Sequence, residues 1–502
     1  MQRAVKQYHH IAIVGTGPSA FYTAKYCLDI NPDIRVDMFE RLPTPYGLVR
    51  YGVAPDHPEV KTVEETFTQV AESGRVRLFA NIEISDNNAS SLSNVLPMNE
   101  LIKSYSGVVL AYGASSDIDL NIPGEHLSGV ISSRKFVNWY NGHPDYANIE
   151  QQEFNLKNVE HVVIIGQGNV ALDCARILSK SVNDLNTTDI SINAINELKN
   201  SNIKSITIIG RRGYIQSAFT IKEIRELTRI KDVNVYISES DIEYSRTTTS
   251  LKEVENNRPK KRLTELIENI AKASHNNTTD TTTATTTMNR QINIRYLTTP
   301  IEIIANEHNQ VSGLKVIRNQ LIGDINKQKA IPIVSTETTI LPCDMVIKAV
   351  GYKCQPITEN IPFNITTNTI PHKYGRVLQN SNSDNNTTTT IIYVSGWLKR
   401  GATGIIASNI PDAKETAAAI AEDIQSDRLR SLDNALLTKD LSKTSPYLPW
   451  MDKLSPIGTA IDWSEYLRIQ TEETRRGEQH VPQKIREKIL SVEELVSIAK
   501  PK

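Results

Sequence analysis

The chain contains few cysteines for its length. Only four occur among 502 residues, Cys27, Cys174, Cys343 and Cys354, and no two of them form a C-x-x-C pair. This scarcity argues against a disulfide framework and favours a reducing compartment. It also excludes a redox-active C-x-x-C dithiol and a cysteine cluster that would hold an iron–sulfur centre within this chain.

Long apolar runs and net charge are lacking as well. No apolar run reaches the roughly 18 residues that a transmembrane helix requires, and residues 1–10 are too short and too polar for a signal peptide or a full transit peptide. A cytosolic protein, a very short presequence and a start near a processed end all stay open. The net charge of −1 gives no support for broad attraction to nucleic acid or membranes. The length allows about two or three domains.

Two glycine-rich turns stand out against this background. They read Gly-Thr-Gly-Pro-Ser-Ala over residues 15–20 and Gly-Gln-Gly-Asn-Val-Ala over residues 166–171. Each follows an apolar β-branched run and precedes a predicted helix, which is the setting of the G-x-G-x-x-G/A dinucleotide-binding turn. The first glycine permits the bend, the second lets the backbone approach a pyrophosphate, and the helix N-terminus faces the phosphates. Two such turns predict two dinucleotides bound side by side.

Residues downstream of each turn distinguish the two sites. Glu40 ends the strand after the first turn, where such units carry an acid that binds a ribose hydroxyl. Arg211 and Arg212 end the corresponding strand after the second turn, and guanidinium groups suit a 2′-phosphate. Solvated side chains at a strand end are the alternative in both cases. The asymmetry predicts FAD at the first turn and NADPH at the second.

A third glycine-rich segment, Ser-Gly-Trp-Leu-Lys-Arg-Gly-Ala-Thr-Gly-Ile-Ile, spans residues 395–406 and follows an apolar strand. We expect residues 404–406 to form a helix N-terminus directed at the flavin ring system. Trp397 offers a flat apolar surface for an aromatic ring, although composition alone favours core packing for it.

Two apolar strands that end in glycine predict where the chain crosses between domains. Residues 108–113 and 345–351 echo one another, and we expect crossings near residues 113 and 346, although two ordinary buried strands would show the same residues. The predicted fold is therefore α/β, with two Rossmann-like dinucleotide-binding domains. Residues 1–113 and 347–502 form the discontinuous FAD-binding domain, and residues 114–346 form the NADPH-binding domain.

Connecting segments of unusual composition complete the predicted organisation. Residues 42–60 are rich in proline and glycine, and a long loop of this kind more often has a function than serves only as a connection. The Asn/Thr-rich segments at 276–287 and 380–390 offer little to bury and are predicted to be surface loops.

Further motifs extend over nearly the whole chain. They occupy residues 15–21, 46–60, 139–142, 166–177, 210–213, 218–223 and 395–406. Together they resemble the adrenodoxin reductase type of ferredoxin–NADP⁺ reductase. The Ala-Pro-Asp-His-Pro loop and the Gly-Gln-Gly-Asn-Val-Ala-Leu-Asp turn are specific to this family rather than to flavoproteins at large. Ser19-Ala20 replaces the usual Ala-Gly, and Ala402 replaces a proline, which are small changes that leave the cofactor assignment intact.

The resemblance implies a glutathione-reductase-like FAD domain interrupted by an NADP domain. It implies a flavoprotein that passes electrons from NADPH through FAD to a 2Fe–2S ferredoxin, one at a time. With the glycine turn, the implied FAD contacts are Gly15, Gly17, Ser19, Ala20, Glu40, Leu48, Ile84, Trp397, Gly404, Ile405 and Ile406. The implied NADPH contacts are Gln167, Gly168, Asn169, Val170, Arg211, Arg212, Glu223 and Gly404. Asp56 and His57 are implied to lie near the flavin, where they tune it or relay protons without being essential.

A basic cluster at residues 258–262 also matches the family. The resemblance implies that Arg258, Lys260, Lys261 and Arg262 belong to a docking surface for an acidic ferredoxin, although a solvated charge run beside a helix is the alternative. Eukaryotic members act on the matrix side of the mitochondrial inner membrane, so peripheral association with that membrane is implied, whereas bacterial members are cytoplasmic.

Three other functions remain open on the sequence. A pyridine nucleotide–disulfide reductase would need the missing dithiol, and an electron-input subunit of a larger complex, like the small subunit of glutamate synthase, would carry a cysteine-rich N-terminal region that is absent here. A nucleotide-holding sensor or scaffold would bind FAD without appreciable turnover.

Overall fold

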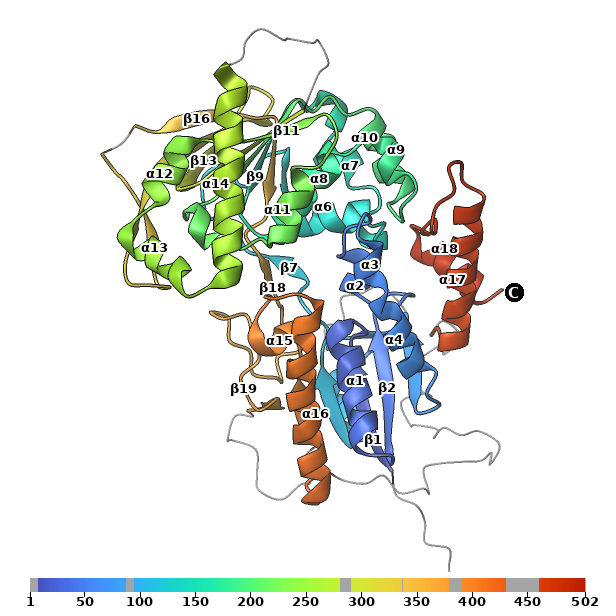
Figure 1. Ribbon diagram of the computed structural model, residues 1–502. Helices are drawn as coiled ribbons and strands as arrows, with labels where there is room; N and C mark the ends of the chain where they lie inside the picture. The colour runs from blue at the N-terminus through green and yellow to red at the C-terminus, as the bar shows by residue number, and fades with distance from the viewer. Residues whose placement is uncertain are drawn as a thin grey trace, which may run out of the picture.

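The computed structural model describes residues 8–86, 94–279, 290–335, 337–378, 390–429 and 460–501. It forms two α/β bodies, one below the other in Figure 1. The Asn/Thr-rich segment at 380–390 lies almost entirely outside the described residues, as do residues 280–287 of the other segment, whereas residues 276–279 continue helix α14. Within the described residues, no helix has both the length and the apolar character that crossing a lipid bilayer requires.

The first body is built on a seven-stranded sheet. Its strands, in spatial order, are β19 (His372–Lys373), β20 (Arg376–Val377), β21 (Ile391–Val394), β6 (Gly107–Leu110), β1 (His9–Val14), β2 (Ile34–Glu40) and β3 (Val76–Ala80). The five strands from β21 to β3 are parallel. Successive residues of β1 enter cores on opposite faces: Ile11 and Ile13 lie in one, and Ala12 and Val14 in the other.

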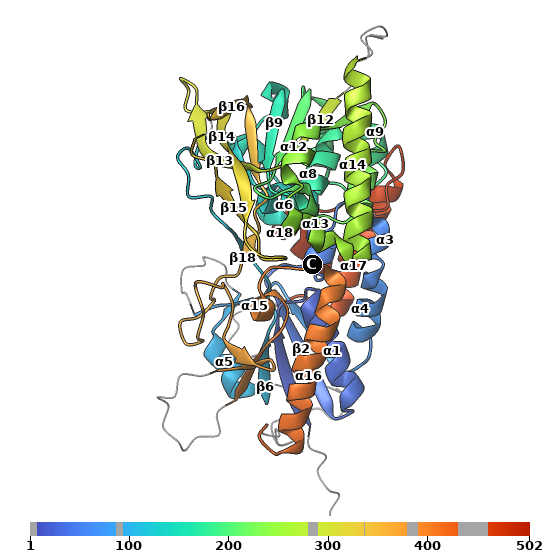
Figure 2. The same cartoon turned by 60° about the vertical axis from the view of Figure 1, so that its left-hand side comes forward.

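Helices and short strands cover this sheet on both sides. They are α1 (Pro18–Ile30), α2 (Leu48–Tyr51), α3 (Pro58–Lys61), α4 (Val63–Ala71), β4 (Glu83–Ile84), β5 (Val95–Leu96), α5 (Met98–Ser104), α15 (Trp397–Arg400), α16 (Asn409–Gln425), α17 (Trp463–Glu478) and α18 (Val492–Ala499). Helices α1 and α16 pack against each other, and they lie side by side in Figures 1 and 2.

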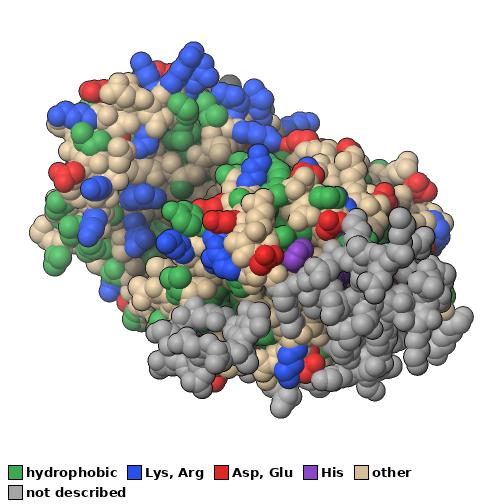
Figure 3. Space-filling model, turned by 90° about the horizontal axis from the view of Figure 1, so that it is seen from below, with side chains coloured by type: hydrophobic (Ala, Val, Ile, Leu, Met, Phe, Trp, Pro, Cys, Tyr) green, Lys and Arg blue, Asp and Glu red, His purple; other side chains and the backbone are tan. Residues whose placement is uncertain are grey.

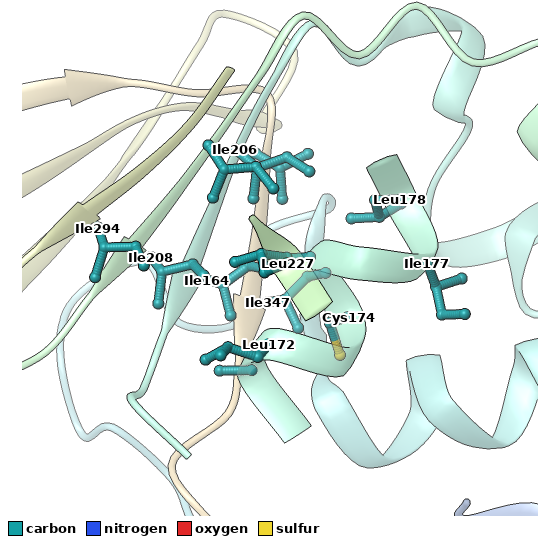
Figure 4. Packing of buried hydrophobic residues seen from close by; sticks show 14 of the residues in the cluster. Ile164, Leu172, Cys174, Ile177, Leu178, Ile206, Ile208, Leu227, Ile294 and Ile347 are labelled. Carbon is teal, nitrogen blue, oxygen red and sulfur yellow. The ribbon is translucent and has the colours of Figure 1, made fainter. Parts of the chain in front are cut away.

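The second body contains a six-stranded parallel sheet. Its order is β11 (Val233–Ile237), β12 (Arg290–Arg295), β10 (Ser205–Ile209), β9 (His161–Ile165), β17 (Met345–Lys348) and β8 (Val130–Ser132). Ile164, Ile208 and Ile347, from three neighbouring strands, lie beside Leu172 and Cys174 of α8 in the core (Figure 4). Strands buried on both faces are typically continuous apolar runs, and residues 162–165 of β9 form such a run.

The helices of this body are α6 (Ser133–Tyr140), α7 (Glu150–Glu153), α8 (Asn169–Ser179), α9 (Val182–Leu185), α10 (Ile192–Lys199), α11 (Ile221–Leu227), α12 (Glu239–Ser245), α13 (Thr248–Glu255) and α14 (Arg258–Thr279). An antiparallel sheet is added at its side, formed by β13 (Thr298–Ala305), β14 (Val311–Ile322), β15 (Lys329–Pro332) and β16 (Thr339–Pro342). Figure 2 shows this sheet as an outer layer of the upper body.

The two crossings between the bodies run side by side. Strand β7 (Ser116–Asp117) pairs antiparallel with β18 (Tyr352–Lys353), and β18 lies between the bodies in Figure 2. The two echoing sequence strands are β6, next to β1, and β17, next to β9, so they hold equivalent places in the two sheets. The predicted crossing near residue 346 falls within β17, all of which belongs to the second sheet.

The C-terminal segment, residues 460–501, contacts both bodies. Arg50 of the first body donates to Glu473 of α17 at 2.5 Å, and both side chains are fully buried. Lys488 lies 3.0 Å from Asp189 of the second body, and Lys484 donates to the carbonyl of Ile190 at 2.8 Å. These contacts join the two bodies on the side opposite the antiparallel sheet (Figure 1).

Candidate functional site: two glycine turns and their shared interface

The first glycine turn leaves an open space at the start of α1. A Cβ on Gly15 would lie 2.6 Å from the carbonyl oxygen of Ala111, so only glycine fits there. Among the residues that the structure describes, a Cβ on Gly17 would meet nothing within 4 Å, and no side chain caps α1, whose N-cap is Gly17. Ala20 is fully buried and lets the helix pack onto the sheet. The turn therefore combines unpartnered helix N–H groups with room for an anion.

Glu40 is bound to this turn rather than solvated at a strand end. Its carboxylate accepts hydrogen bonds from the amide and the hydroxyl of Thr16, at 3.2 and 2.6 Å, and from the amide of Leu42 at 3.1 Å. A carboxylate can accept about four hydrogen bonds, so acceptor capacity remains. The side chain is thereby held at the edge of the open space beside Gly17.

The second glycine turn repeats this construction. A Cβ on Gly166 would lie 2.2 Å from the carbonyl oxygen of Ala349, whereas a Cβ on Gly168 would meet nothing within 4 Å. Helix α8 also begins without a cap from any described side chain. Ala111 and Ala349 both follow the strand beside their turn, so the same backbone contact forces the first glycine in each body.

Gln167 and Asn169 of the second turn organise neighbouring loops. Gln167 packs so closely on Gly210 that a Cβ there would lie 1.7 Å from the Gln167 side chain, and its Nε2 donates to the carbonyl of Arg295 at 3.4 Å. Asn169 accepts a hydrogen bond from the amide of Thr220 at 2.9 Å. Val170 is half-buried against the core of the second body.

Arg211 and Arg212 follow β10 on the open side of this turn. Both side chains are exposed, and neither has an ion-pair partner among the residues that the structure describes. Their backbone is fixed, because the carbonyl of Arg212 accepts from the amide of Leu297 at 3.1 Å and the carbonyl of Arg211 accepts from the side chain of Asn319 at 2.8 Å. Two uncompensated guanidinium groups on a fixed backbone suit a dianionic ligand group.

The third glycine-rich segment lies against the first turn. The hydroxyl of Ser19 donates to the hydroxyl of Ser395 at 2.8 Å, which ties the start of α1 to this segment. Trp397 donates from its indole N–H to the carbonyl of Thr403 at 3.1 Å, and its partly buried side chain packs against the core of the first body. Gly404 has φ +86°.

The remaining predicted FAD contacts differ in their accessibility. Ile405 is 62% exposed, and Ile406 begins the short 3₁₀ turn that leads into α16. Leu48 starts α2 directly after Gly47, and a Cβ on Gly47 would lie 3.1 Å from the Cα of Gly17. The side chain of Ile84 lies in the core of the first body and the residue is 5% exposed, so the structure does not present that side chain to the open space.

Asp56 and His57 are held against the second body by one buried arginine. Arg176, in α8, donates from Nε and Nη2 to the carboxylate of Asp56 at 2.8 and 3.1 Å, and its Nη2 lies 3.5 Å from Nδ1 of His57. Nε2 of His57 lies 2.6 Å from a carboxylate oxygen of Glu226 in α11. The sequence reasoning missed Arg176 and Glu226, although Arg176 lies within the matching stretch 166–177.

Arg176 also neutralises the acidic groups around it. It donates to Asp173 at 2.7 Å and to Glu223 at 2.9 Å, and its own side chain is 1% exposed. Burial would raise the pKa of Asp56, but hydrogen bonds and charge from Arg176 and Lys180 hold that pKa well below its usual range. Burial raises the pKa of Asp173 to about 6. Ligand atoms of His57, Asp173 and Glu223 lie within 4.8 Å of one another, but the guanidinium occupies the place that a cation would take.

The predicted docking residues differ from one another in their pairing. Lys260 is bound to Glu253 at 2.7 Å, which removes it from a free basic surface. Arg258, Lys261 and Arg262 are exposed at the start of α14, without an ion-pair partner in the described parts of the chain. Figure 3 shows Lys and Arg side chains gathered over the left-hand lobe, on the side where Figure 1 places α12 and α13.

All four cysteines are free and buried. Burial raises the pKa of the Cys27 and Cys343 thiols to about 12, which makes them poor nucleophiles. The structure therefore offers no reactive thiol pair for disulfide exchange among these four residues.

Comparisons with known proteins agree with this architecture. The family model described as pyridine nucleotide-disulphide oxidoreductase matches residues 9–267, a range that holds both glycine turns. The chain is 38% identical over 493 residues to NADPH:adrenodoxin oxidoreductase, mitochondrial, of Arabidopsis thaliana, with 98% of this chain and 95% of that protein covered. It is 34% identical to the Homo sapiens protein of that name, covering 97% and 91%. A solved structure of Mycobacterium tuberculosis FprA in complex with NADPH matches with a TM-score of 0.82 and 32% identity, covering 98% of this chain and all of that one (100%).

Proposed function

This chain belongs to the family of the NADPH:adrenodoxin oxidoreductases, and from that premise we propose that it is a flavoprotein passing electrons from NADPH through FAD to a 2Fe–2S ferredoxin, one at a time. The observation that carries the proposal is the asymmetry of the two glycine turns. One turn is bordered by a fixed carboxylate, Glu40, and the other by two guanidinium groups, Arg211 and Arg212, that have no ion-pair partner among the described residues. This difference assigns a different dinucleotide to each turn.

The first turn fits FAD. The open space beside Gly17 and the uncapped start of α1 suit the pyrophosphate, and the remaining acceptor capacity of Glu40 suits ribose hydroxyls. Gly404, Ile405 and Trp397 would line the flavin end of the site. Bound FAD supplies the chemistry that converts two-electron donation by a nicotinamide into one-electron delivery.

The second turn fits NADPH. The start of α8 beside Gly168 suits the pyrophosphate, and Arg211 and Arg212 would bind the 2′-phosphate that distinguishes NADPH from NADH. Arg176 positions the residues between the turns by holding Asp56 and Glu223 on one guanidinium. His57 shares this cluster through its contact with Glu226.

The basic start of α14 is the surface we assign to the ferredoxin. Arg258, Lys261 and Arg262 are exposed and unpaired in the described parts of the chain, and such a surface on a nearly neutral protein steers an acidic partner. Lys260 is left out of this surface because Glu253 already neutralises it.

We also propose a location on the matrix side of the mitochondrial inner membrane, with peripheral association. The proposal is supported by the word mitochondrial in the names of the Arabidopsis thaliana and Homo sapiens relatives. A bacterial relative, the NADPH-ferredoxin reductase FprA of Mycobacterium leprae, is 37% identical over 422 residues, and its name does not include the word mitochondrial. Fractionation of cells expressing the tagged full chain tests the assignment.

Replacing Arg211 and Arg212 together by alanine tests the NADPH assignment. Each hydrogen bond between a guanidinium and a phosphate contributes about 1.5 kcal/mol at an exposed site, so kcat/KM for NADPH should fall about 100-fold while that for NADH is unchanged. Ferricyanide serves as the electron acceptor, so that ferredoxin binding does not enter the rate. The double variant K327A/K329A removes two exposed charges from the same domain and is the matched control. A preserved preference for NADPH in R211A/R212A would contradict the assignment.

A further inference from the structure

We propose that Asn319 is a positioning residue that sets the preference for NADPH by fixing the backbone that carries Arg211 and Arg212. The inference rests on the proposed function, because it takes those two arginines to bind the 2′-phosphate. Asn319 itself lies beneath the arginine loop, in strand β14 of the added antiparallel sheet.

The side chain of Asn319 is buried and directed at the arginine loop. The residue is 1% exposed, and its Nδ2 donates to the carbonyl of Arg211 at 2.8 Å and to the hydroxyl of Thr299 at 2.7 Å. Its own amide donates to the carbonyl of Leu297 at 2.7 Å, which anchors Asn319 to the residue that precedes β13. In the described parts of the chain, no other side chain bonds to the backbone of Arg211 or Arg212.

The rest of the loop is held by backbone hydrogen bonds from the same side. The amide of Thr298 donates to the carbonyl of Gly210 at 2.9 Å, and the amide of Leu297 donates to the carbonyl of Arg212 at 3.1 Å. Leu297 adopts φ +51°, a conformation that costs a non-glycine residue energy and turns its amide toward the loop. Three successive carbonyls thus face the antiparallel sheet, and Asn319 provides the only contact to the middle one from a described residue.

This arrangement links a buried amide to nucleotide selectivity. A guanidinium binds a phosphate well only when its N–H groups are correctly directed, and a displacement of about 1 Å weakens such a site. Releasing the carbonyl of Arg211 lets the loop move between its two outer anchors. NADH has no 2′-phosphate, so its binding does not depend on where the guanidinium groups lie.

The variant N319L tests the proposal, because leucine fills a similar volume but cannot donate to Arg211. Loss of one such hydrogen bond should raise the KM for NADPH about fivefold, with kcat and the KM for NADH unchanged. Binding of 2′,5′-ADP, measured by calorimetry, should weaken by the same factor, whereas binding of 5′-AMP should not. T299V removes the other partner of the same amide and leaves the Arg211 contact in place, so its nucleotide preference should match that of the unmodified protein.

Equal losses for NADPH and NADH in N319L, or no loss for either, would overturn the inference, as would a T299V variant that loses selectivity to the same extent. If N319L does not accumulate as a folded flavoprotein, N319S is used, because serine is too short to reach Arg211. The double variant R211A/R212A is measured in parallel. If R211A/R212A keeps its preference for NADPH over NADH, the phosphate assignment itself is refuted. If R211A/R212A loses that preference but N319L keeps it, only the role of Asn319 is refuted.

Discussion

Replacing Arg176 by methionine removes the group that joins the Asp56–His57 loop to α8 and α11. Methionine keeps much of the side-chain volume, so the charge and the five N–H donors are what is lost. In the native protein these donors reach three carboxylates, those of Asp56, Asp173 and Glu223, which are at most 16% exposed in their side chains. Breaking a buried ion pair by removing one partner costs about 3–5 kcal/mol, because the other charge stays buried without compensation.

We therefore expect R176M to unfold at a clearly lower urea concentration than the unmodified protein, with far-UV circular dichroism as the assay. R475M is the matched control, because Arg475 pairs with Glu472 on the exposed surface of α17, where such pairs contribute little. R176K keeps the charge but not the bidentate geometry, so its midpoint should fall between the two. An R176M midpoint equal to that of R475M would refute the reasoning.

The same variant has a predicted pH dependence. The pKa of Asp56 lies well below its usual range, so the stabilisation it provides is fully present above about pH 4 and is lost as the pH falls toward the depressed pKa. The difference in urea midpoint between R176M and the unmodified protein should therefore be largest above pH 4 and shrink in more acidic solution.

Two further predictions concern single groups in this region and on the surface. Burial raises the pKa of Asp173 to about 6, so the native state holds one more proton than the unfolded state between about pH 4 and pH 6, and the stability falls as the pH rises through that window. The variant D173N should abolish this fall, measured as urea midpoints across the same pH range. An unchanged pH dependence in D173N would contradict the prediction. The variant R258E/R262E should raise the KM for a 2Fe–2S ferredoxin and flatten the dependence of that KM on salt concentration. The rate with ferricyanide as acceptor is the reference, because it does not involve ferredoxin binding. An unchanged KM would place the docking surface elsewhere.

Much of the architecture could be predicted from local sequence signals. The predicted α/β fold with two dinucleotide-binding domains is confirmed by the two parallel sheets and by the matches to the family. The strand–turn–helix pattern is local, so the turns at Gly15 and Gly166 were visible in the sequence. The echo between β6 and β17 reflects a real equivalence, because each supplies the alanine carbonyl that excludes a Cβ from its turn.

Other features depend on contacts between distant residues and left little local signal. The predicted second boundary, after residue 346, falls within β17, and the apolar run of that strand gives no sign of which sheet it joins. In the sequence nothing distinguishes Arg176 from an ordinary helix residue. Its role appears only in the fold, where Asp56 and Glu223 contact it. The pairing of Lys260 with Glu253 could not be read from a run of basic residues.

The reduction of cytochrome c by NADPH, with and without an added 2Fe–2S ferredoxin, tests the central claim most directly. The purified full chain should show a flavin absorption spectrum, and the rate should depend on ferredoxin, strongly prefer NADPH over NADH and weaken as salt is added. A rate indifferent to ferredoxin, or equal rates with NADH and NADPH, would contradict the proposed function.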